Sequence, residues 1–190
     1  SGLQRGDLVI VAARPSMGKT TFAMNLVENA VLHNDQPVLV FSMEMPAEQL
    51  LMRMSASVGR VAFEHVRVPS KMREEDWPRL TAATTKIAQS NIHIDETPAM
   101  TPAQIRARAR RFKQRHGCGL IVVDYLQLMQ VPGYKPGQRT AEITEASRSL
   151  KAVAKELNVP VIALSQLNRS LESRQDKRPI MSDLRESGAI

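Results

Sequence analysis

LVIVAARPSMGKT, residues 8–20, is the stretch of sequence that decides the fold. Its first five residues are apolar and mostly β-branched, which predicts a short buried strand, and Pro15 and Gly18 end that strand in a loop. From Lys19 to residue 31 apolar residues recur at spacings of three and four, which indicates an amphipathic helix. A Gly-Lys-Thr sequence between a strand and a helix is the context that a phosphate-binding loop requires.

Ala13 stands where the general phosphate-loop motif has its first glycine. Because alanine disfavours a positive φ, either the loop does not need that conformation there or the match to the motif is accidental. A purely structural turn would leave the Gly-Lys-Thr sequence at a helix start unexplained. We therefore interpret nine residues as nucleotide-binding: Ala13, Arg14, Pro15, Ser16, Met17, Gly18, Lys19, Thr20 and Thr21.

Within this loop, backbone N–H groups and the helix N-terminus would bind phosphate oxygens. Lys19 would neutralise the β- and γ-phosphates, and the Thr20 hydroxyl would ligate Mg²⁺. The loop thus predicts ATP and Mg²⁺ as cofactors.

The rest of the chain alternates between strand and helix patterns. Strands are predicted at residues 38–41, 91–95, 120–123 and 161–164, and helices at 46–58, 73–88, 101–116 and 141–157. The helix at 101–116 has the clearest start, because Thr101, Pro102 and Gln104 match a capping box with proline at the first helical position. Strands that are apolar throughout and alternate with helices predict an α/β fold, a mainly parallel sheet with helices on both faces.

Three polar side chains follow predicted strands, where the ligands of such sheets bind. Asp124 ends the strand at 120–123 and is expected to hold the Mg²⁺ shell. Glu44, just past residues 38–41, is a candidate catalytic base for the water that attacks the γ-phosphate, unless it only caps the helix that starts near residue 46. Gln166 follows the last strand, and its amide could bind the γ-phosphate and report its loss, unless it is a loop residue with no role.

The composition excludes several classes of protein. A chain of 190 residues with 43% hydrophobic residues suits one domain, and no apolar run approaches the roughly 18 residues that a membrane span needs. The amino end has no signal-peptide pattern and reads as a cut end. One cysteine, Cys118, leaves no intrachain disulfide, which fits a reducing, cytoplasmic compartment. The net charge of +7 favours polyanionic partners, and with only 4% aromatic residues any nucleic acid would be held mainly by its phosphates.

Other features have simpler explanations. The four histidines show no metal-ligand spacing, and Trp77 and the ten methionines are expected in the core. Six basic residues on the predicted 101–116 helix are expected to form its solvated outer face or a subunit contact: Arg106, Arg108, Arg110, Arg111, Lys113 and Arg115.

Six strings carry a family resemblance: GLQRGDL at residues 2–8, ARPSMGKT at 13–20, FSMEM at 41–45, VDYLQLM at 123–129, LSQLNR at 164–169 and DLRESG at 183–188. Together they resemble the motor domain of the bacterial DnaB-type replicative helicases, and the alanine at position 13 is similar to that family's own version of the loop. The resemblance implies, motif by motif, the same roles that the strand-end positions suggest: Lys19 and Thr20 for phosphate and Mg²⁺, Glu44 for catalysis, Asp124 for the metal shell and Gln166 for sensing the γ-phosphate. It adds a loop that contacts the DNA backbone: Arg185, Glu186 and Gly188.

The resemblance implies a RecA-like P-loop NTPase and a homohexameric ring with ATP between subunits. It also implies 5′ to 3′ movement on single-stranded DNA and duplex unwinding at the bacterial replication fork, with a helicase loader and primase as partners and no membrane. From Gln166 to Ile190 there is no aromatic residue, so the DNA-contacting loop would bind phosphates independently of sequence.

Residues 1–190 are expected to form one motor domain of a longer protein. The family's primase-binding domain would precede Ser1, and the final strands, with basic residues that reach the neighbour's nucleotide, would follow Ile190. Two alternatives remain, a RecA- or RadA-like recombination ATPase that forms filaments and a nucleotide-switched scaffold that does not need Glu44. The strings at 165–169 and 183–188 argue against the recombination ATPase. Measured ATP turnover would distinguish the helicase motor from the scaffold.

Overall fold

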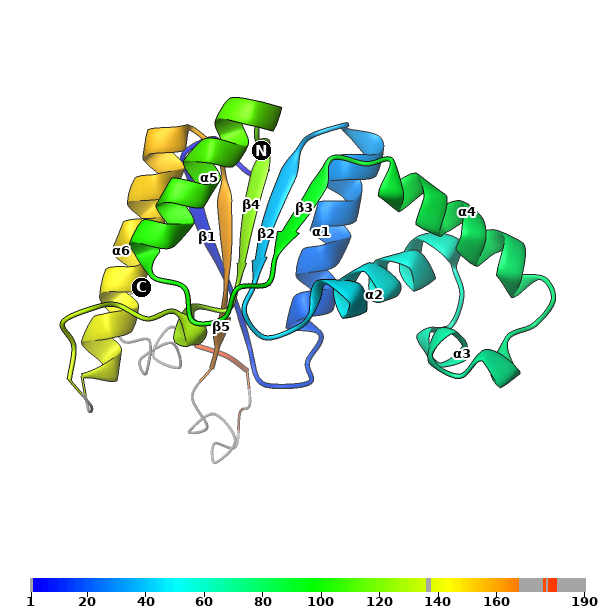
Figure 1. Cartoon of the computed structure of the whole chain (residues 1–190). Coiled ribbons are helices and arrows are strands. Elements are labelled where there is room, and N and C mark those ends of the chain that lie inside the picture. Colours follow the sequence, from blue (N-terminus) through cyan, green and yellow to red (C-terminus); the bar gives the residue numbers. More distant parts are fainter. Residues whose placement is uncertain (1, 136–137, 168–175, 177, 181–190) are drawn as a thin grey trace.

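Five parallel strands form the centre of the computed structural model, which describes residues 2–135, 138–167, 176 and 178–180 (Figure 1). The order across the sheet is β1-β5-β4-β2-β3. These strands are β1 (Leu8–Ala13), β2 (Val38–Ser42), β3 (Ile92–Asp95), β4 (Leu120–Asp124) and β5 (Val161–Gln166). Because all pairs are parallel, the carboxyl ends of the strands meet at one edge of the sheet.

Helices cover both faces of this sheet, as Figure 1 shows. They are α1 (Lys19–His33), α2 (Ala47–Gly59), α3 (Phe63–Arg67), α4 (Asp76–Ala88), α5 (Pro102–His116) and α6 (Arg139–Leu157), with 3₁₀ turns η1 (Pro69–Lys71) and η2 (Leu126–Leu128). The predicted α/β architecture is therefore confirmed. Within the described part of the chain, no helix is both long and apolar enough to cross a membrane.

The two faces of the sheet carry separate hydrophobic clusters. All five residues of β2 are buried, and their alternation sends Leu39 and Phe41 toward α5 and α6 while Val38 and Val40 pack with α1 and α2. Central strands covered on both sides need no polar face, which is why β2, β4 and β5 are apolar except at their carboxyl ends.

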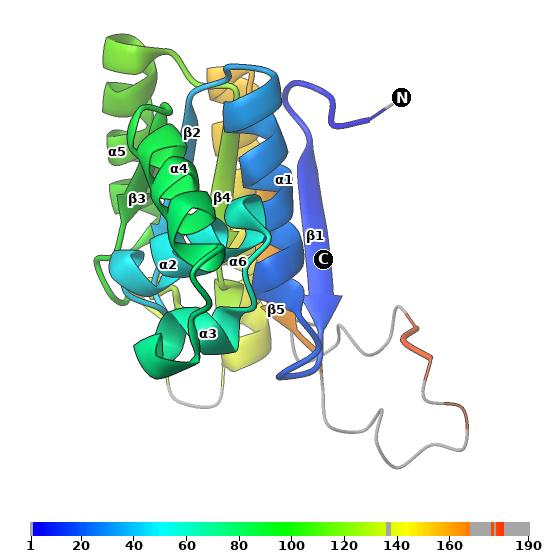
Figure 2. The same cartoon turned by 90° about the vertical axis from the view of Figure 1, so that its right-hand side faces the viewer.

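The segment from α2 to α4 extends away from the sheet, and in Figure 2 it faces the viewer. Helix α2 packs closely on α4 at Gly59, where an added Cβ would lie 3.1 Å from the backbone oxygen of Arg79. This segment also contains α3 and η1, which lie in the polar stretch between the predicted helices at 46–58 and 73–88, where the sequence predicts no element. Helix α4 begins at residue 76 and not at 73, since the Asp76 carboxylate accepts the Arg73 N–H at 3.1 Å and closes a turn there.

The prediction that Trp77 lies in the core is wrong, because this side chain is 51% exposed. Helix α4 buries Asp76, Ala83 and Ile87, and Trp77 lies off that stripe. Met17, in the phosphate loop, is 74% exposed and is also not a core residue. Five other methionines are buried as predicted: Met24, Met43, Met54, Met100 and Met129.

The basic face of α5 is tied to its neighbours by ion pairs. Arg106 Nε lies 2.6 Å from a Glu156 carboxylate oxygen on α6, and Arg110 pairs with the same carboxylate. Arg108 pairs with Asp95 at the end of β3. The predicted solvated face is therefore partly an intramolecular contact, which holds α5 against α6 and the sheet edge.

Helix α5 also starts as predicted, and this start can be tested. The Thr101 hydroxyl accepts the Gln104 N–H at 3.2 Å, and the Gln104 side chain accepts the Thr101 N–H at 2.9 Å. We expect Thr101→Ala to lower the free energy of unfolding by about 1 kcal/mol, measured as a lower urea midpoint at unchanged slope. The control is Thr85→Ala on α4, an exposed helix-interior position where the same change should leave the free energy of unfolding unchanged or raise it by a few tenths of a kcal/mol, because alanine is the better helix former. Equal losses in both variants would contradict the cap.

Candidate functional site

The predicted site residues gather at the carboxyl edge of the sheet. Strand register places Ala13 of β1 beside Gln166 of β5, and Ser42 of β2 beside Asp124 of β4. A cavity of about 350 Å³ opens at this edge. It is lined by Ala13, Arg14, Pro15, Ser16, Gly18, Lys19, Thr20, Thr21, Glu44, Met45, Arg53 and Gln166.

The loop between β1 and α1 takes its two left-handed positions at Ser16 and Gly18, where φ is 65° and 82°. Ala13 belongs to β1, has no positive φ, and accepts the Leu167 N–H at 3.1 Å through its backbone oxygen. The loop therefore does not need a left-handed residue at position 13, so Ala13 is compatible with the phosphate-loop interpretation. The exposed Met17 side chain is the one predicted nucleotide-binding side chain that does not line the cavity.

Lys19 and Thr20, which line the cavity, form a cluster with Asp124, which contacts both but does not itself line the cavity. The Thr20 hydroxyl donates to Asp124 Oδ2 at 2.8 Å, and Lys19 Nζ lies 3.7 Å from Asp124 Oδ1. Lys19 Nζ also lies 4.2 Å from the centre of the Tyr125 ring. Because β5 lies between β1 and β4, the contacts of Lys19 and Thr20 with Asp124 connect the phosphate loop after β1 to the end of β4.

Burial makes both charges of the cluster costly. Burial raises the pKa of the Asp124 carboxyl above its ordinary value, although the Thr20 hydrogen bond and the Lys19 charge oppose that shift. Burial likewise lowers the pKa of the Lys19 ammonium, against the opposing charges of Asp124 and Glu44. Asp124 is only 2% exposed, and its Oδ1 is buried without a hydrogen-bond partner among the described residues. Such a site favours a bound cation on the carboxylate and an anion on the ammonium.

Glu44 is exposed at the rim of this cavity, beyond the end of β2. Its position is fixed from both sides, because the Met43 N–H donates to the Asp124 backbone oxygen at 2.9 Å and the Ser42 hydroxyl donates to the Met45 backbone oxygen at 2.6 Å. It does not cap α2, since the Ala47 N–H donates to Glu96 Oε2 at 2.7 Å and no side-chain cap is formed. The structure thus removes the capping alternative and leaves the carboxylate facing the cavity.

Two residues near the site, Arg53 and Gln127, were missed from the sequence, and a third, Arg14, has a contact that the sequence did not indicate. Arg53 of α2 lines the cavity with its guanidinium 4.7 Å from the Phe63 ring centre, and nothing in the sequence distinguishes it from other polar positions of that helix. Arg14 was assigned only as part of the loop, but it donates to the Leu167 backbone oxygen at 2.8 Å. Gln127 hydrogen-bonds to the end of β5. A polar residue within the apolar run at 126–129 was the available signal for Gln127.

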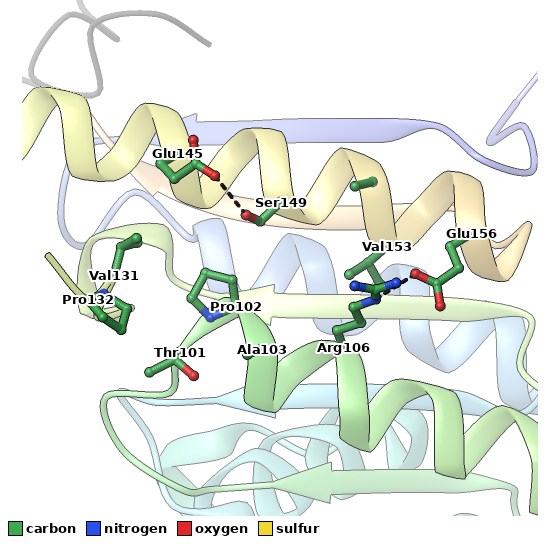
Figure 3. Close-up of a pocket in the computed structure, with 11 residues that line it drawn as sticks. Thr101, Pro102, Ala103, Arg106, Val131, Pro132, Glu145, Ser149, Val153 and Glu156 are labelled. Atoms are coloured by element: carbon green, nitrogen blue, oxygen red, sulfur yellow. Dashed lines mark hydrogen bonds and ion pairs between the residues drawn. The ribbon is translucent and has the colours of Figure 1, made fainter.

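A second cavity, of about 400 Å³, lies in the groove between α5 and α6 (Figure 3). None of the residues that line it lines the phosphate-loop cavity. Figure 3 shows the Arg106–Glu156 ion pair and mostly small or apolar side chains around it. The predicted DNA-contacting residues Arg185, Glu186 and Gly188 lie outside the described residues.

A phosphate loop between the first strand and first helix of a parallel sheet, with a buried acid two strands away, defines a P-loop domain of the RecA-like class. The family description "DnaB-like helicase C terminal domain" matches residues 1–190. The chain belongs to this family.

Individual relatives agree with that assignment. The chain is 58% identical over 192 residues to "Replicative DNA helicase DnaB" of Buchnera aphidicola subsp. Acyrthosiphon pisum, covering 100% of this chain and 41% of that protein. It is 52% identical over 190 residues to "Replicative DNA helicase DnaC" of Bacillus subtilis, covering 100% of this chain and 42% of that one. The chain therefore spans about two fifths of the length of these curated relatives.

Solved structures show the same fold. A structure described as an ATPase domain superposes with a TM-score of 0.90 and 39% sequence identity, over 97% of this chain and 66% of that one. "The Structure Of A DnaB-Like Replicative Helicase And Its Interactions With Primase" gives a TM-score of 0.91 and 40% identity, over 98% of this chain and 45% of that one. The RecA-like sheet implied by the sequence is confirmed by these neighbours.

The charged cluster predicts the effect of removing Lys19. We expect Lys19→Ala to weaken nucleotide binding by at least about tenfold, because an ammonium–phosphate contact contributes about 1.5 to 3 kcal/mol. The midpoint of thermal unfolding should stay close to that of the unaltered chain, since Lys19 contributes charge and little apolar packing. Titration with ATP and a circular dichroism melt measure the two effects. Lys86→Ala, at an exposed position of α4, is the matched control, and equal ATP affinity in both variants would remove Lys19 from the site.

Proposed function

We propose that this chain is the ATP-driven motor of a replicative DNA helicase, which couples ATP hydrolysis to 5′ to 3′ movement on single-stranded DNA and to duplex unwinding. The observation that carries the proposal is the contact of Lys19 and Thr20 with the buried Asp124 beneath the phosphate-loop cavity. Membership of the DnaB-like family supports the DNA part of the proposal. ATP turnover by the full-length protein, with and without single-stranded DNA, is its direct test.

Mg²⁺ is the proposed metal, and the donor set suits it. Asp124 Oδ1 is a buried carboxylate oxygen that makes no hydrogen bond to the described residues. The Thr20 hydroxyl donates a hydrogen bond to the other oxygen of the same carboxylate, Oδ2. Mg²⁺ takes oxygen ligands, typically one or two from protein and the rest from phosphates and water. Asp124 and Thr20 would hold the ion, which supplies charge neutralisation of the β- and γ-phosphates.

Three side chains would act on the γ-phosphate. Lys19, which lines the cavity, would neutralise its charge, and Glu44 would orient and deprotonate the attacking water from the rim. Gln166 would contact the γ-phosphate and register its loss, because it lines the same cavity at the end of β5. These roles are supported by position in one cavity and by the finding that Glu44 does not cap α2.

The proposal extends to the whole protein, of which residues 1–190 would be one motor domain. A homohexamer with ATP between subunits would form the ring, and a helicase loader would place it on DNA in the bacterial cytoplasm. Primase is a proposed partner because one structural neighbour is a DnaB-like replicative helicase described together with its interactions with primase. Light scattering with and without nucleotide and single strand would measure the assembly.

DNA contact is proposed for Arg185, Glu186 and Gly188, carried over from the family motif. The chain's net charge of +7 suits a phosphate backbone, and residues 166–190 contain no aromatic side chain for base stacking. Binding that depends on phosphates alone would let the motor pass any sequence.

Two other functions are less well supported. A recombination ATPase would share the sheet and the loop, but the family match over residues 1–190 is to helicases. A nucleotide-switched scaffold would not need Glu44. The Glu44 carboxylate lines the cavity and does not cap α2, so its position favours a role in catalysis. Measured ATP hydrolysis would exclude the scaffold.

Removal of the base tests the chemistry. Glu44→Gln in the full-length ring should leave ATP binding intact and lower kcat by about 10² to 10⁴, the range for loss of general-base catalysis. Steady-state turnover and an ATP titration measure the two quantities. Glu48→Gln, the same change at an exposed residue of α2 four positions further along the chain, should have normal kcat. Near-normal turnover by Glu44→Gln would show that another group activates the water.

Removal of a DNA contact tests the binding mode. Arg185→Ala in the full-length ring should weaken affinity similarly for poly-dT and for a mixed single strand, and reduce the slope of log affinity against log salt by about 0.7 per lost phosphate contact. Titration of both strands over a salt series measures this. The control is Arg67→Ala, at an exposed position of α3. An unchanged slope, or a loss of affinity for one strand only, would contradict a phosphate-tracking role.

A further inference from the structure

Strand β5 extends beyond its partner at the edge where the site lies. Its pairing with β4 ends at Ala163, opposite Val123, whereas its pairing with β1 continues to Gln166, opposite Ala13. In a strand, the N–H and C=O of one residue point to the same side, and those of the next residue point to the other. Because the Leu167 N–H reaches Ala13, the backbone groups of Gln166 face the side that β4 has left.

The Gln127 carboxamide fills that place. Its Oε1 accepts the Gln166 N–H at 3.2 Å, and its Nε2 donates to the Gln166 backbone oxygen at 3.2 Å. The same Nε2 donates to the hydroxyl of the fully buried Ser165 at 2.9 Å. A carboxamide has both a donor and an acceptor, so it can satisfy a strand residue as a neighbouring backbone would.

Gln127 is itself held firmly. It lies in η2, three residues after Asp124, and the preceding Leu126 is buried. The Arg139 guanidinium donates to the Gln127 backbone oxygen and pairs with Glu142, whose carboxylate accepts the Val131 N–H at 3.1 Å. The turn that carries Gln127 is therefore anchored to α6.

Gln166 lies between two cavities. One is the phosphate-loop cavity, and the other is a third cavity, of about 390 Å³, which Gln127 also lines. Arg14 lines both of these cavities. Its side chain makes no hydrogen bond to another described residue, so only its backbone fixes where the amide can reach. That backbone is fixed on one side by β1 and on the other by Gln127.

We propose that Gln127 is a positioning residue, which holds Gln166 at a set place relative to Asp124 so that the Gln166 amide meets the γ-phosphate. This inference rests on the proposed ATPase function. Its consequence is that the strand end carrying the metal ligand and the strand end carrying the phosphate sensor move together, because one side chain links them. Misplacement of a reacting geometry by about 1 Å can cost about 10²-fold in rate.

The test uses Gln127→Glu in the full-length protein. This change keeps the size and one acceptor but removes both N–H donations. We expect kcat to fall about 10- to 100-fold with KM for ATP little changed, and the preference for ATP over ADP in equilibrium binding to fall toward one. Gln130→Glu is the control, an exposed glutamine just past the same turn, and should behave as the unaltered protein. Gln127→Met, of similar volume, carries the same test if the first variant does not fold.

A double variant separates positioning from general support. In a Gln166→Ala background, Gln127→Glu should cause no further loss of kcat, because the amide that it positions is already gone. Additive losses would overturn the inference and leave Gln127 a stabilising residue only. Normal kcat and normal ATP preference in Gln127→Glu would overturn it as well, with the ATPase function intact. If the unaltered protein does not hydrolyse ATP, the proposed function itself fails.

Discussion

The buried carboxylate of Asp124 is the feature on which the geometry of the site depends. Taking a carboxylate out of water is costly, and a hydrogen bond from Thr20 with a nearby Lys19 ammonium offsets that cost in part. Both partners lie at the start of α1, so the contact fixes the phosphate loop relative to β4 across the intervening β5. The Asp124 backbone oxygen, which accepts the Met43 N–H, fixes the end of β2 in the same way. The phosphate loop and the segment that carries Glu44 are therefore both positioned by groups of one residue, Asp124.

Much of this arrangement could be predicted from sequence, because it depends on local rules. The apolar strands predicted the covered sheet, Thr101 and Gln104 predicted the start of α5, and the rule that ligands bind at strand ends selected Glu44, Asp124 and Gln166. The structure brings Glu44 and Gln166 together with the phosphate loop around one cavity, and Asp124 contacts Lys19 and Thr20, which line it. Their catalytic roles stay predictions.

The rest depended on tertiary contacts that leave little trace in sequence. Helix α3 has five residues and no buried stripe, so periodicity could not reveal it. Trp77 was placed in the core on residue type alone, but the side of α4 that packs on α2 is set by Gly59 and the small Ala83. Gln127 needed the strand order and the unequal lengths of β4 and β5, which no single segment encodes.

Side chains replace missing backbone partners around the cavity, and this leaves the side chains of Glu44 and Gln166 without such a role. The Gln127 carboxamide hydrogen-bonds to the backbone of Gln166 at the end of β5, and Glu96 accepts the first N–H of α2. Arg14 donates to the Leu167 backbone oxygen. Unpaired backbone groups at such ends would otherwise destabilise the fold. Since these residues meet that requirement, the side chains of Glu44 and Gln166 make no hydrogen bond to the described part of the chain. Their freedom is a product of the surrounding structure, because a carboxylate or amide already committed to a strand or helix end could not also turn toward a phosphate.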